Sequence, residues 1–236
     1  MTEKETKEKV IDRRGIGTNN EKSLHSDIKN LYSDENSKVE YKVGSYIIDV
    51  IKDDVFYEIQ TKNFYAIGRK LKEITEENNN VVLVHPIAVE KYIVTLNEEG
   101  KVMSRRKSPK RGILVDVFDE LVSTPYLLGN ENFKLEVLMI VEEEIRKSDG
   151  KGSWRRKGIS IVDRKLVKVL EKHTFNSIED FQCFLPKELP EYFTNKDLAA
   201  TLNVPVHKVR KITYTLKNAE IIKECGKRGR EILFCR

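Results

Sequence analysis

The sequence predicts an α+β fold in two parts: a mixed β-sheet covered by helices in an α/β/α arrangement, then a small helical domain that ends in a hairpin. Three observations carry this prediction. They are two helical patterns that enclose three short strand patterns, one long apolar run, and a C-terminal pattern of helix, turn, helix and hairpin. We expect a disordered tail over 1–18, a first domain over 19–125, a connecting α/β segment over 126–184 and a second domain over 185–236.

The first domain alternates helical and strand patterns. Apolar residues recur at helical spacing in two segments, and Gly44-Ser45 and Asp53-Asp54 are typical of tight turns between strands. The run VVLVHPIAV is continuously apolar and rich in β-branched residues, which fits a strand buried on both faces. The expected elements are a helix over 21–32, strands over 39–43, 46–51 and 55–60, a helix over 64–74 and a strand over 81–89.

The middle of the chain is less informative. FKLEVLMIVEEEI alternates well enough to predict a strand, while GSWRRKGISIVDRKLVKVLEKH suggests a basic loop, a strand and a helix. We interpret Trp154 as a packing anchor, although an indole beside two arginines could also stack on a base.

Composition excludes several classes of protein. No apolar run approaches the roughly 20 residues of a membrane span, so we expect no membrane partner. The charged N-terminal sequence MTEKETKEKVIDRRG lacks the apolar core of a secretory signal, which favours the cytoplasm. Cys183, Cys225 and Cys235 are far apart without CxxC spacing, so we expect neither a disulfide framework nor a cysteine-ligated zinc site.

Positive charge gathers in two segments. KVMSRRKSPKR carries no acid and six bases, namely Lys101, Arg105, Arg106, Lys107, Lys110 and Arg111. Residues 205–230 carry eight bases against Glu220 and Glu224. One such run is more often a solvated face, but two runs in structured contexts favour a nucleic-acid partner, because local clusters of bases attract polyanions.

Acids interrupt the three short strands. If the turns centre on Gly44-Ser45 and Asp53-Asp54, Glu40 lies opposite Asp49 and Asp49 opposite Glu58. Opposed like charges in a sheet cost about 0.2 to 1 kcal/mol per pair. A divalent cation, Mg²⁺ or Mn²⁺, would reverse the sign of that interaction, since it binds carboxylate oxygens. A turn one residue longer would move Asp49 to the other face and remove the cluster.

The residues around this cluster resemble the PD-(D/E)XK nuclease superfamily, which has the restriction-endonuclease-like fold. The match comprises Asp49 in IIDV, Glu58-Ile59-Gln60 in EIQT and Glu21 on the preceding helix, over roughly 21–96. The resemblance implies that Asp49 and Glu58 hold the metal, with Glu21 or, from the register, Glu40 as a third acid.

One position departs from the family pattern. Gln60 stands where the family usually has lysine. We expect Gln60 to orient the attacking water and Lys62 or Lys70 to supply the positive charge. His25, on the helix with Glu21, is expected on the helix surface, and the alternative is that it reaches the acid cluster. His85 is expected in a structural role at a strand end.

The last fifty residues or so carry a separate pattern. Thr194 is a candidate N-cap for a helix over 195–202, Pro205 breaks it, and a second helix starts at Val206 with an apolar face at Val209, Ile212, Leu216 and Ala219. IIKEC and REILF flank a basic tip. This pattern resembles a winged helix-turn-helix domain, in which the second helix enters the major groove and the wing contacts phosphates. The residues expected at DNA are His207, Lys208, Arg210, Lys211, Tyr214, Lys227 and Arg228.

These expectations combine into a function. We predict a Mg²⁺- or Mn²⁺-dependent DNA endonuclease that a winged helix tethers to DNA. Its partner is DNA, and cutting both strands would favour a homodimer. The alternative is a non-catalytic DNA-binding regulator whose degenerate nuclease-like domain serves for dimerisation, and Gln60 is the feature that favours it.

Overall fold

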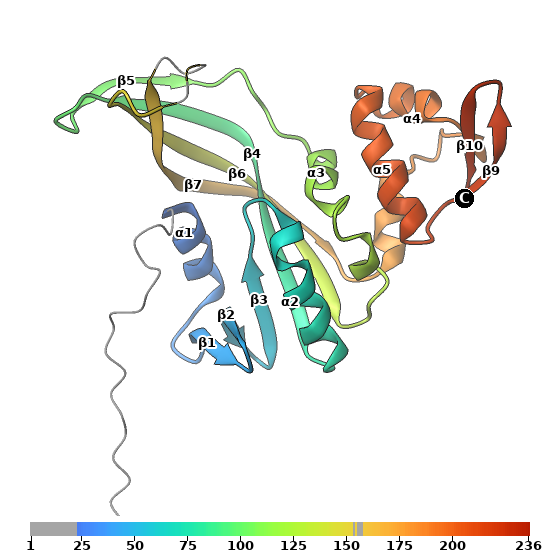
Figure 1. The fold of residues 1–236 in the computed structure, drawn as a ribbon, viewed down its shortest axis with the longest axis horizontal. Helices are drawn as coiled ribbons and strands as arrows, with labels where there is room; N and C mark the ends of the chain where they lie inside the picture. The colour runs from blue at the N-terminus through green and yellow to red at the C-terminus, as the bar shows by residue number, and fades with distance from the viewer. Residues whose placement is uncertain (1–22, 153, 155–157) are drawn as a thin grey trace, which may run out of the picture.

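The computed structural model describes residues 23–152, 154 and 158–236, and shows a mixed β-sheet with helices on it (Figure 1). The expected tail over 1–18 and Glu21 lie outside the described residues. In chain order the helices, 3₁₀ helices (η) and strands are α1 (Ser23–Tyr32), β1 (Lys38–Val43), β2 (Tyr46–Lys52), β3 (Val55–Ile59), α2 (Phe64–Glu76), β4 (Asn80–Leu96), β5 (Val102–Lys107), η2 (Leu114–Val117), α3 (Phe118–Leu121), η3 (Pro125–Leu127), β6 (Phe133–Ser148), β7 (Ile159–Phe175), η5 (Ile178–Phe184), β8 (Tyr192–Phe193), α4 (Asn195–Leu202), α5 (Val206–Asn218), β9 (Lys223–Arg228) and β10 (Glu231–Cys235).

The main sheet has the strand order β1-β2-β3-β4-β6-β7, and β5 also pairs with β4. β4 runs parallel to β3 and to β6, while the other pairs are antiparallel, so the sheet is mixed as predicted. The segment 126–184, expected to connect two domains, contributes β6 and β7 to this same sheet. The prediction of a helix after Gly158 is wrong, because this segment forms β7, which pairs with β6 over nearly its whole length. Pairing with a long neighbouring strand thus outweighs an ambiguous local pattern.

Helices cover both faces of the sheet, as the alternation of side chains along β4 shows. Alternate residues of a strand point to opposite faces. Val81 and Leu83 join the apolar cluster of the α2 residues Phe64 and Leu71, whereas Val82 and Val84 join that of the α1 residues Leu24 and Ile28. The expectation that this run forms a strand buried on both faces is confirmed.

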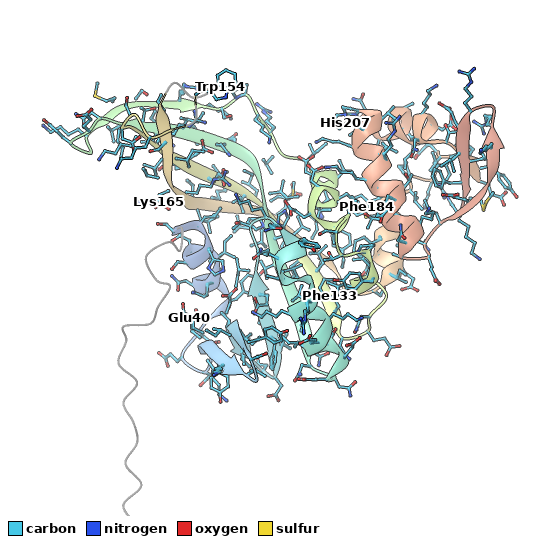
Figure 2. All side chains as sticks on the ribbon, viewed as in Figure 1. Glu40, Phe133, Trp154, Lys165, Phe184 and His207 are labelled. Atoms are coloured by element: carbon cyan, nitrogen blue, oxygen red, sulfur yellow. A yellow bond between two sulfur atoms is a disulfide. The ribbon has the colours of Figure 1, made fainter. Side chains whose placement is uncertain are left out.

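The long strands continue beyond the helices as an arm, which we define as residues 90–107, 141–152, 154 and 158–168. β5 pairs with the distal half of β4, so the arm is four strands wide. Register shifts between Ala88 and Glu90 and within the β6–β7 pair mark bulges, which bend strands. The arm accordingly curves away from the core (Figure 1). Trp154, expected as a packing anchor, is 83% exposed near the end of the arm (Figure 2).

The C-terminal part, residues 185–236, contains α4, α5 and a three-stranded sheet in the order β8-β10-β9. Thr194 caps α4 as predicted: its hydroxyl oxygen accepts hydrogen bonds from the backbone N–H groups of Lys196 and Asp197. The predicted apolar face of α5 is buried. α5 packs beside α3 of the main part (Figure 1), so the two parts share one apolar core.

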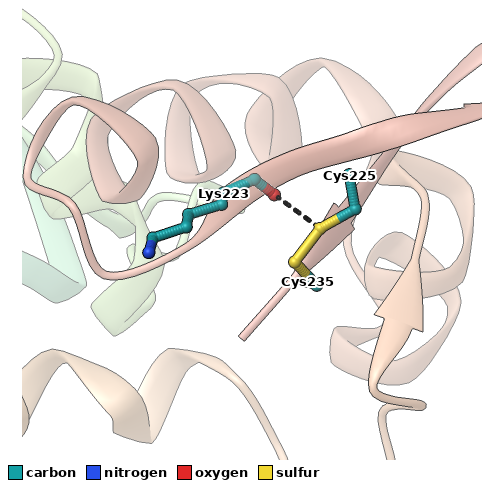
Figure 3. The surroundings of a disulfide bond; sticks show 3 residues. All are labelled: Lys223, Cys225 and Cys235. Carbon is teal, nitrogen blue, oxygen red and sulfur yellow. Dashed lines mark hydrogen bonds between the residues drawn. A yellow bond between two sulfur atoms is a disulfide. The ribbon is translucent and has the colours of Figure 1, made fainter.

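A disulfide joins Cys225 of β9 to Cys235 of β10 (Figure 3), so the expectation that these cysteines stay unpaired is wrong. The hairpin brings the two Cα atoms within 6.0 Å although ten residues separate them in the chain. Spacing alone could not show this, because it depends on where the hairpin turns. Among the described residues, no helix is both long and apolar enough to cross a membrane.

Candidate functional site

The candidate site lies where β2 and β3 separate. Their backbone pairing runs from Lys52↔Val55 to Val50↔Tyr57, the predicted register, and stops one residue before Asp49 and Glu58. Beyond this point, side-chain contacts take the place of hydrogen bonds between the two backbones. Asp49 Oδ2 accepts a hydrogen bond from the N–H of Ile59 at 2.8 Å, and Glu58 Oε1 lies 3.4 Å from the backbone nitrogen of Asp49. The two carboxyl groups are therefore brought together and held by the backbone.

Lys70 of α2 completes this pair. Its Nζ lies 2.5 Å from Glu58 Oε1 and also donates to the carbonyl of Ile47. The amphipathic pattern of α2 buries Phe64, Leu71 and Ile74 against the sheet, which carries the half-buried Lys70 to the edge of the acids. Lys62, the other candidate for the positive charge, is exposed in the loop before α2. The structure therefore favours Lys70.

Gln60, expected to orient the attacking water, is engaged through its amide nitrogen. Its Nε2 donates to the carbonyls of Lys62 at 2.6 Å and Asn63 at 3.2 Å, so its amide nitrogen is used to hold the loop that enters α2. Asn63 there has a left-handed backbone. Gln60 thus acts on the shape of the loop.

His25 was expected on the helix surface, and the structure corrects this. Its Nε2 lies 3.1 Å from Asp49 Oδ2, so α1 delivers an imidazole to the acids. In the predicted helix His25 follows Glu21 by four residues and shares its face, which was the signal available in the sequence. We call Asp49, Glu58, Lys70 and His25 the acid–lysine cluster.

Glu40 does not join the predicted row of three carboxylates. The β1–β2 register is as expected on both sides of it, Val39↔Val50 and Tyr41↔Ile48. Glu40 lies inside β1 with a φ of 51° and is skipped in the pairing with β2, and its carboxylate lies 2.8 Å from Lys29 Nζ. The row is thus reduced to Asp49 and Glu58. His85 was expected at a strand end, but it lies inside β4, where it is buried with its Nδ1 2.7 Å from the carbonyl oxygen of Gln60.

The two carboxyl groups of the cluster differ in pKa. Burial raises the pKa of Glu58 to about 7, the negative charge of Asp49 adds to this, and Lys70 opposes it only in part. Burial also acts to raise the pKa of Asp49, but His25 and the N–H of Ile59 outweigh it and hold that pKa below its usual value. Near neutral pH Asp49 is therefore fully ionised, whereas Glu58 is ionised only in part. A bound cation would favour full ionisation of Glu58.

The donor set fits a hard divalent cation in part. Among residues 23–152, 154 and 158–236, no group of three or more His, Cys, Asp or Glu side chains is arranged to hold a metal. Asp49 and Glu58 offer two carboxylates, and Mg²⁺ is commonly held by one or two carboxylates together with water and substrate phosphate. The cluster thus has the acids for such an ion if a phosphate supplies the rest.

On α5, the predicted DNA-binding residues divide into exposed and paired ones. His207, Arg210 and Tyr214 are exposed, and Figure 2 shows His207 on the outside of the helix. Lys208 pairs with Asp116, and Lys211 Nζ lies 2.7 Å from Asp119, so these two bases face the main part of the molecule. Only part of the predicted basic face is thus turned outward.

The hairpin and the arm show the same division. In the hairpin, Lys227 is exposed and Arg228 pairs with Asp197 at 2.8 Å. In the arm, Arg105 lies over the Tyr92 ring and 2.8 Å from Glu143, and Lys107 pairs with Glu90. Arg106 of the arm is exposed, as are Lys110 and Arg111 in the loop after β5.

Comparison with other proteins assigns the chain to a family. Residues 22–176 match the family described as a domain of unknown function, DUF8091, and the chain belongs to it. This match spans α1 to β7 and so includes the acid–lysine cluster and the arm. An uncharacterized protein of Treponema pallidum (strain Nichols) is 33% identical over 220 residues, which cover 93% of this chain and 86% of that protein. No solved structure matches the chain.

Proposed function

We propose that this member of the DUF8091 family is a metal-dependent DNA endonuclease with a restriction-endonuclease-like core and a C-terminal winged helix. The observation that carries the proposal is the convergence of Asp49, Glu58 and Lys70 where β2 and β3 separate. Burial raises the pKa of Glu58 to about 7, which costs stability at neutral pH, and carboxyl groups perturbed in this way beside a second acid and a lysine are concentrated at functional sites.

Each member of the cluster has a role in phosphodiester hydrolysis. Asp49 and Glu58 would hold Mg²⁺ or Mn²⁺, which when bound lowers the pKa of water and neutralises charge on the scissile phosphate. Lys70, held by Glu58 and the Ile47 carbonyl, places an ammonium beside the reacting phosphate. His25 fixes the orientation of the Asp49 carboxylate. Lys70 thus supplies the charge that Gln60 lacks.

The C-terminal part would bring the cluster to DNA. Two helices joined at Pro205 and a hairpin with a basic tip are the elements of a winged helix, whose second helix enters the major groove. Arg210 and Tyr214 would meet the groove and Lys227 the phosphates, with Arg106 of the arm following the backbone further along. A DNA substrate favours the cytoplasm as the compartment, and cutting both strands favours a homodimer.

The test is cleavage of labelled duplex, branched and single-stranded DNA in Mg²⁺, Mn²⁺ or EDTA. We expect metal-dependent cutting that falls about 10³-fold or more in Asp49→Asn, because one metal ligand loses its charge. We also expect Mg²⁺ or Mn²⁺ to raise the melting temperature of the wild type and not of Asp49→Asn. Asp53→Asn is the matched control, because Asp53 is an exposed acid of the same strand pair and asparagine tolerates its positive φ.

Two outcomes would contradict the proposal. If metal shifts the melting temperatures of Asp49→Asn and Asp53→Asn equally, Asp49 is not a metal ligand. Tight DNA binding without cutting in any metal would favour the alternative, a DNA-binding regulator that uses the nuclease-like core for dimerisation.

A further inference from the structure

The start of α1 lies between the arm and the acid–lysine cluster and contacts both. Successive residues of a helix are about 100° apart around its axis. Leu24 and Ile28 therefore share one stripe, which is buried against the sheet. By the same spacing, Ser23 and Asp27 lie on one flank of this stripe, and His25 lies on the other. The two flanks thus face different strands of the sheet.

On the first flank, Asp163 of β7 holds the start of the helix. Its Oδ1 accepts a hydrogen bond from the backbone N–H of Ser23 at 3.0 Å, and its Oδ2 accepts from the Ser23 hydroxyl at 2.5 Å. The first N–H groups of a helix have no partner within the helix, and a carboxylate there meets the positive end of the helix dipole. Asp163 thus does for α1 what an N-cap residue does, from 140 residues away in the chain.

The contact with Ser23 also fixes the charge of Asp163. Burial acts to raise the pKa of Asp163, but the hydrogen bonds from Ser23 outweigh it and hold that pKa below its usual value. The carboxylate is therefore ionised at neutral pH, which is the form that binds N–H and O–H donors most strongly.

A second contact ties the same flank of α1 to β7. The N–H of Leu166 donates to Asp27 Oδ2 at 2.9 Å. It lies next to a register shift between Lys168 and Leu166, which marks a bulge in the β6–β7 pair. Leu166 also packs against the apolar cluster that contains Leu24. The start of α1 is therefore fixed to the arm strand β7, below which α1 lies in Figure 1.

On the second flank, His25 reaches the cluster. Its Nε2 lies 3.1 Å from Asp49 Oδ2. His25 is only two residues from Ser23 and lies in the same helical turn, so the bonds from Asp163 to Ser23 restrict where the imidazole can lie. The arm and the cluster are thus joined through a single turn of helix.

We infer that Asp163 is a positioning residue for the proposed metal site: from the arm it fixes the first turn of α1, which sets His25 against Asp49. The inference rests on the proposed function for what the cluster does. It adds that full metal affinity requires the arm to hold α1 in place, because groups that orient metal ligands contribute to the affinity for the metal.

The first experiment records the NMR signals of the His25 ring nitrogens in the metal-free full chain at one pH. The signals are identified by their absence from His25→Ala. We expect them to shift in Asp163→Ala, because the imidazole loses its fixed contact with Asp49. Asp163→Asn should keep them close to the wild-type positions, since asparagine caps the start of a helix about as well as aspartate.

Asp149→Ala is the matched control. Asp149 accepts from the hydroxyl of Ser160 at 2.7 Å and from the N–H of Lys151 at 3.0 Å. The variant therefore removes the same kind of contact within the arm itself, and it should leave the His25 signals unchanged. If Asp163→Ala does not fold, Ser23→Ala removes the hydroxyl half of the contact and should shift the same signals.

The second experiment measures Mn²⁺ binding by calorimetry in the same variants. We expect Asp163→Ala to weaken Mn²⁺ binding about fivefold and His25→Ala about tenfold. The double variant should bind Mn²⁺ no more weakly than His25→Ala, because Asp163 acts through His25. Additive losses would make Asp163 an independent contributor and overturn the inference.

The two measurements separate this inference from the proposed function. If the wild type binds no Mn²⁺ while the His25 signals shift in Asp163→Ala and not in Asp149→Ala, the metal site is absent and Asp163 still positions His25. If the signals are the same in Asp163→Ala and wild type, Asp163 does not position His25. That result would overturn the inference and leave a Mn²⁺-binding nuclease standing.

Discussion

The acids of the acid–lysine cluster and the bases of the arm and C-terminal part are held in opposite ways. Asp49 and Glu58 are largely buried, and backbone N–H groups together with His25 and Lys70 fix them. The bases of the arm and of α5 are exposed or half-buried, and several lie against acids of the same chain, as Lys211 does with Asp119. In the cluster, the fixed positions of the side chains determine what chemistry is possible. On the surfaces, the positive charge that remains after ion pairing determines how strongly a polyanion is attracted.

This difference shows that a run of basic residues in the sequence overstates the positive charge that the folded surface presents. The eight bases of residues 205–230 suggested a strongly positive face, yet Lys208, Lys211, Lys217 and Arg228 all lie against carboxylates. Exposed ion pairs contribute little to stability, so DNA phosphates can compete for such bases. A buried pair such as Glu58 and Lys70 is held more firmly. Substitutions in the cluster should therefore change chemistry sharply, and those on the surfaces should change affinity gradually.

The first prediction compares substitutions of Lys70 and Lys62, and its expected effect is the largest of those that follow. We expect Lys70→Ala to lower the single-turnover cleavage rate about 10²- to 10³-fold, because the ammonium beside Glu58 is lost. Lys62→Ala removes the same charge from an exposed loop position. The cleavage rate of this variant should stay within about twofold of the wild-type rate. Similar losses in the two variants would mean that the cluster geometry does not select the catalytic lysine.

The second prediction concerns stability and pH at Glu58. Its folded-state pKa of about 7 lies above the usual 4.5, so the folded protein binds the proton more tightly than the unfolded chain. The free energy of unfolding should therefore fall as pH rises from about 4.5 to about 7, by up to about 3 kcal/mol. Glu58→Gln should remove this fall and be the more stable protein at pH 8, as measured by urea denaturation without metal.

The control for this prediction is Glu35→Gln, which changes an exposed acid in the loop before β1. It should keep the pH dependence of the wild type. If Glu58→Gln is less stable than wild type at pH 8, the Lys70 ion pair outweighs burial and the cluster is a structural salt bridge.

A third, smaller effect compares the two basic surfaces. Arg210→Ala should weaken duplex binding about tenfold and reduce sequence preference, because an exposed arginine on the second helix would reach base edges. Arg106→Ala in the arm should weaken binding of all sequences by about threefold and lower the salt slope by about one, as expected of a phosphate contact. Anisotropy titrations over several salt concentrations measure both, and the reverse ranking would make the arm the main DNA-binding surface.

The sequence predicted the fold where local chemistry decides it. Gly44-Ser45 and Asp53-Asp54 set the register of β1, β2 and β3, because two-residue turns leave few alternatives. β7 was misread in part as a helix, since its pairing with β6 is non-local. The disulfide between Cys225 and Cys235 likewise depends on the hairpin register.

The site was predictable only in part, for a similar reason. The motif residues Asp49 and Glu58 were identified from strand spacing, and the structure brings them together. The choice of Lys70 over Lys62, and the approach of His25, depend on how α2 and α1 pack on the sheet. Partners of surface bases, such as Asp119, lie 92 residues away from theirs in the chain and leave no local signal.

The smallest expected effect tests whether pairing limits the C-terminal surface. Lys211 and Asp119 form an exposed pair between α5 and α3. Asp119→Asn should free Lys211 and strengthen duplex binding about two- to threefold, with the salt slope rising by up to about one, because one more base can contact phosphate. Glu99→Gln is the matched control: it frees Lys101 from an exposed pair at the tip of the arm. If Glu99→Gln strengthens duplex binding and Asp119→Asn does not, DNA passes over the arm, and α5 instead holds the C-terminal part against α3.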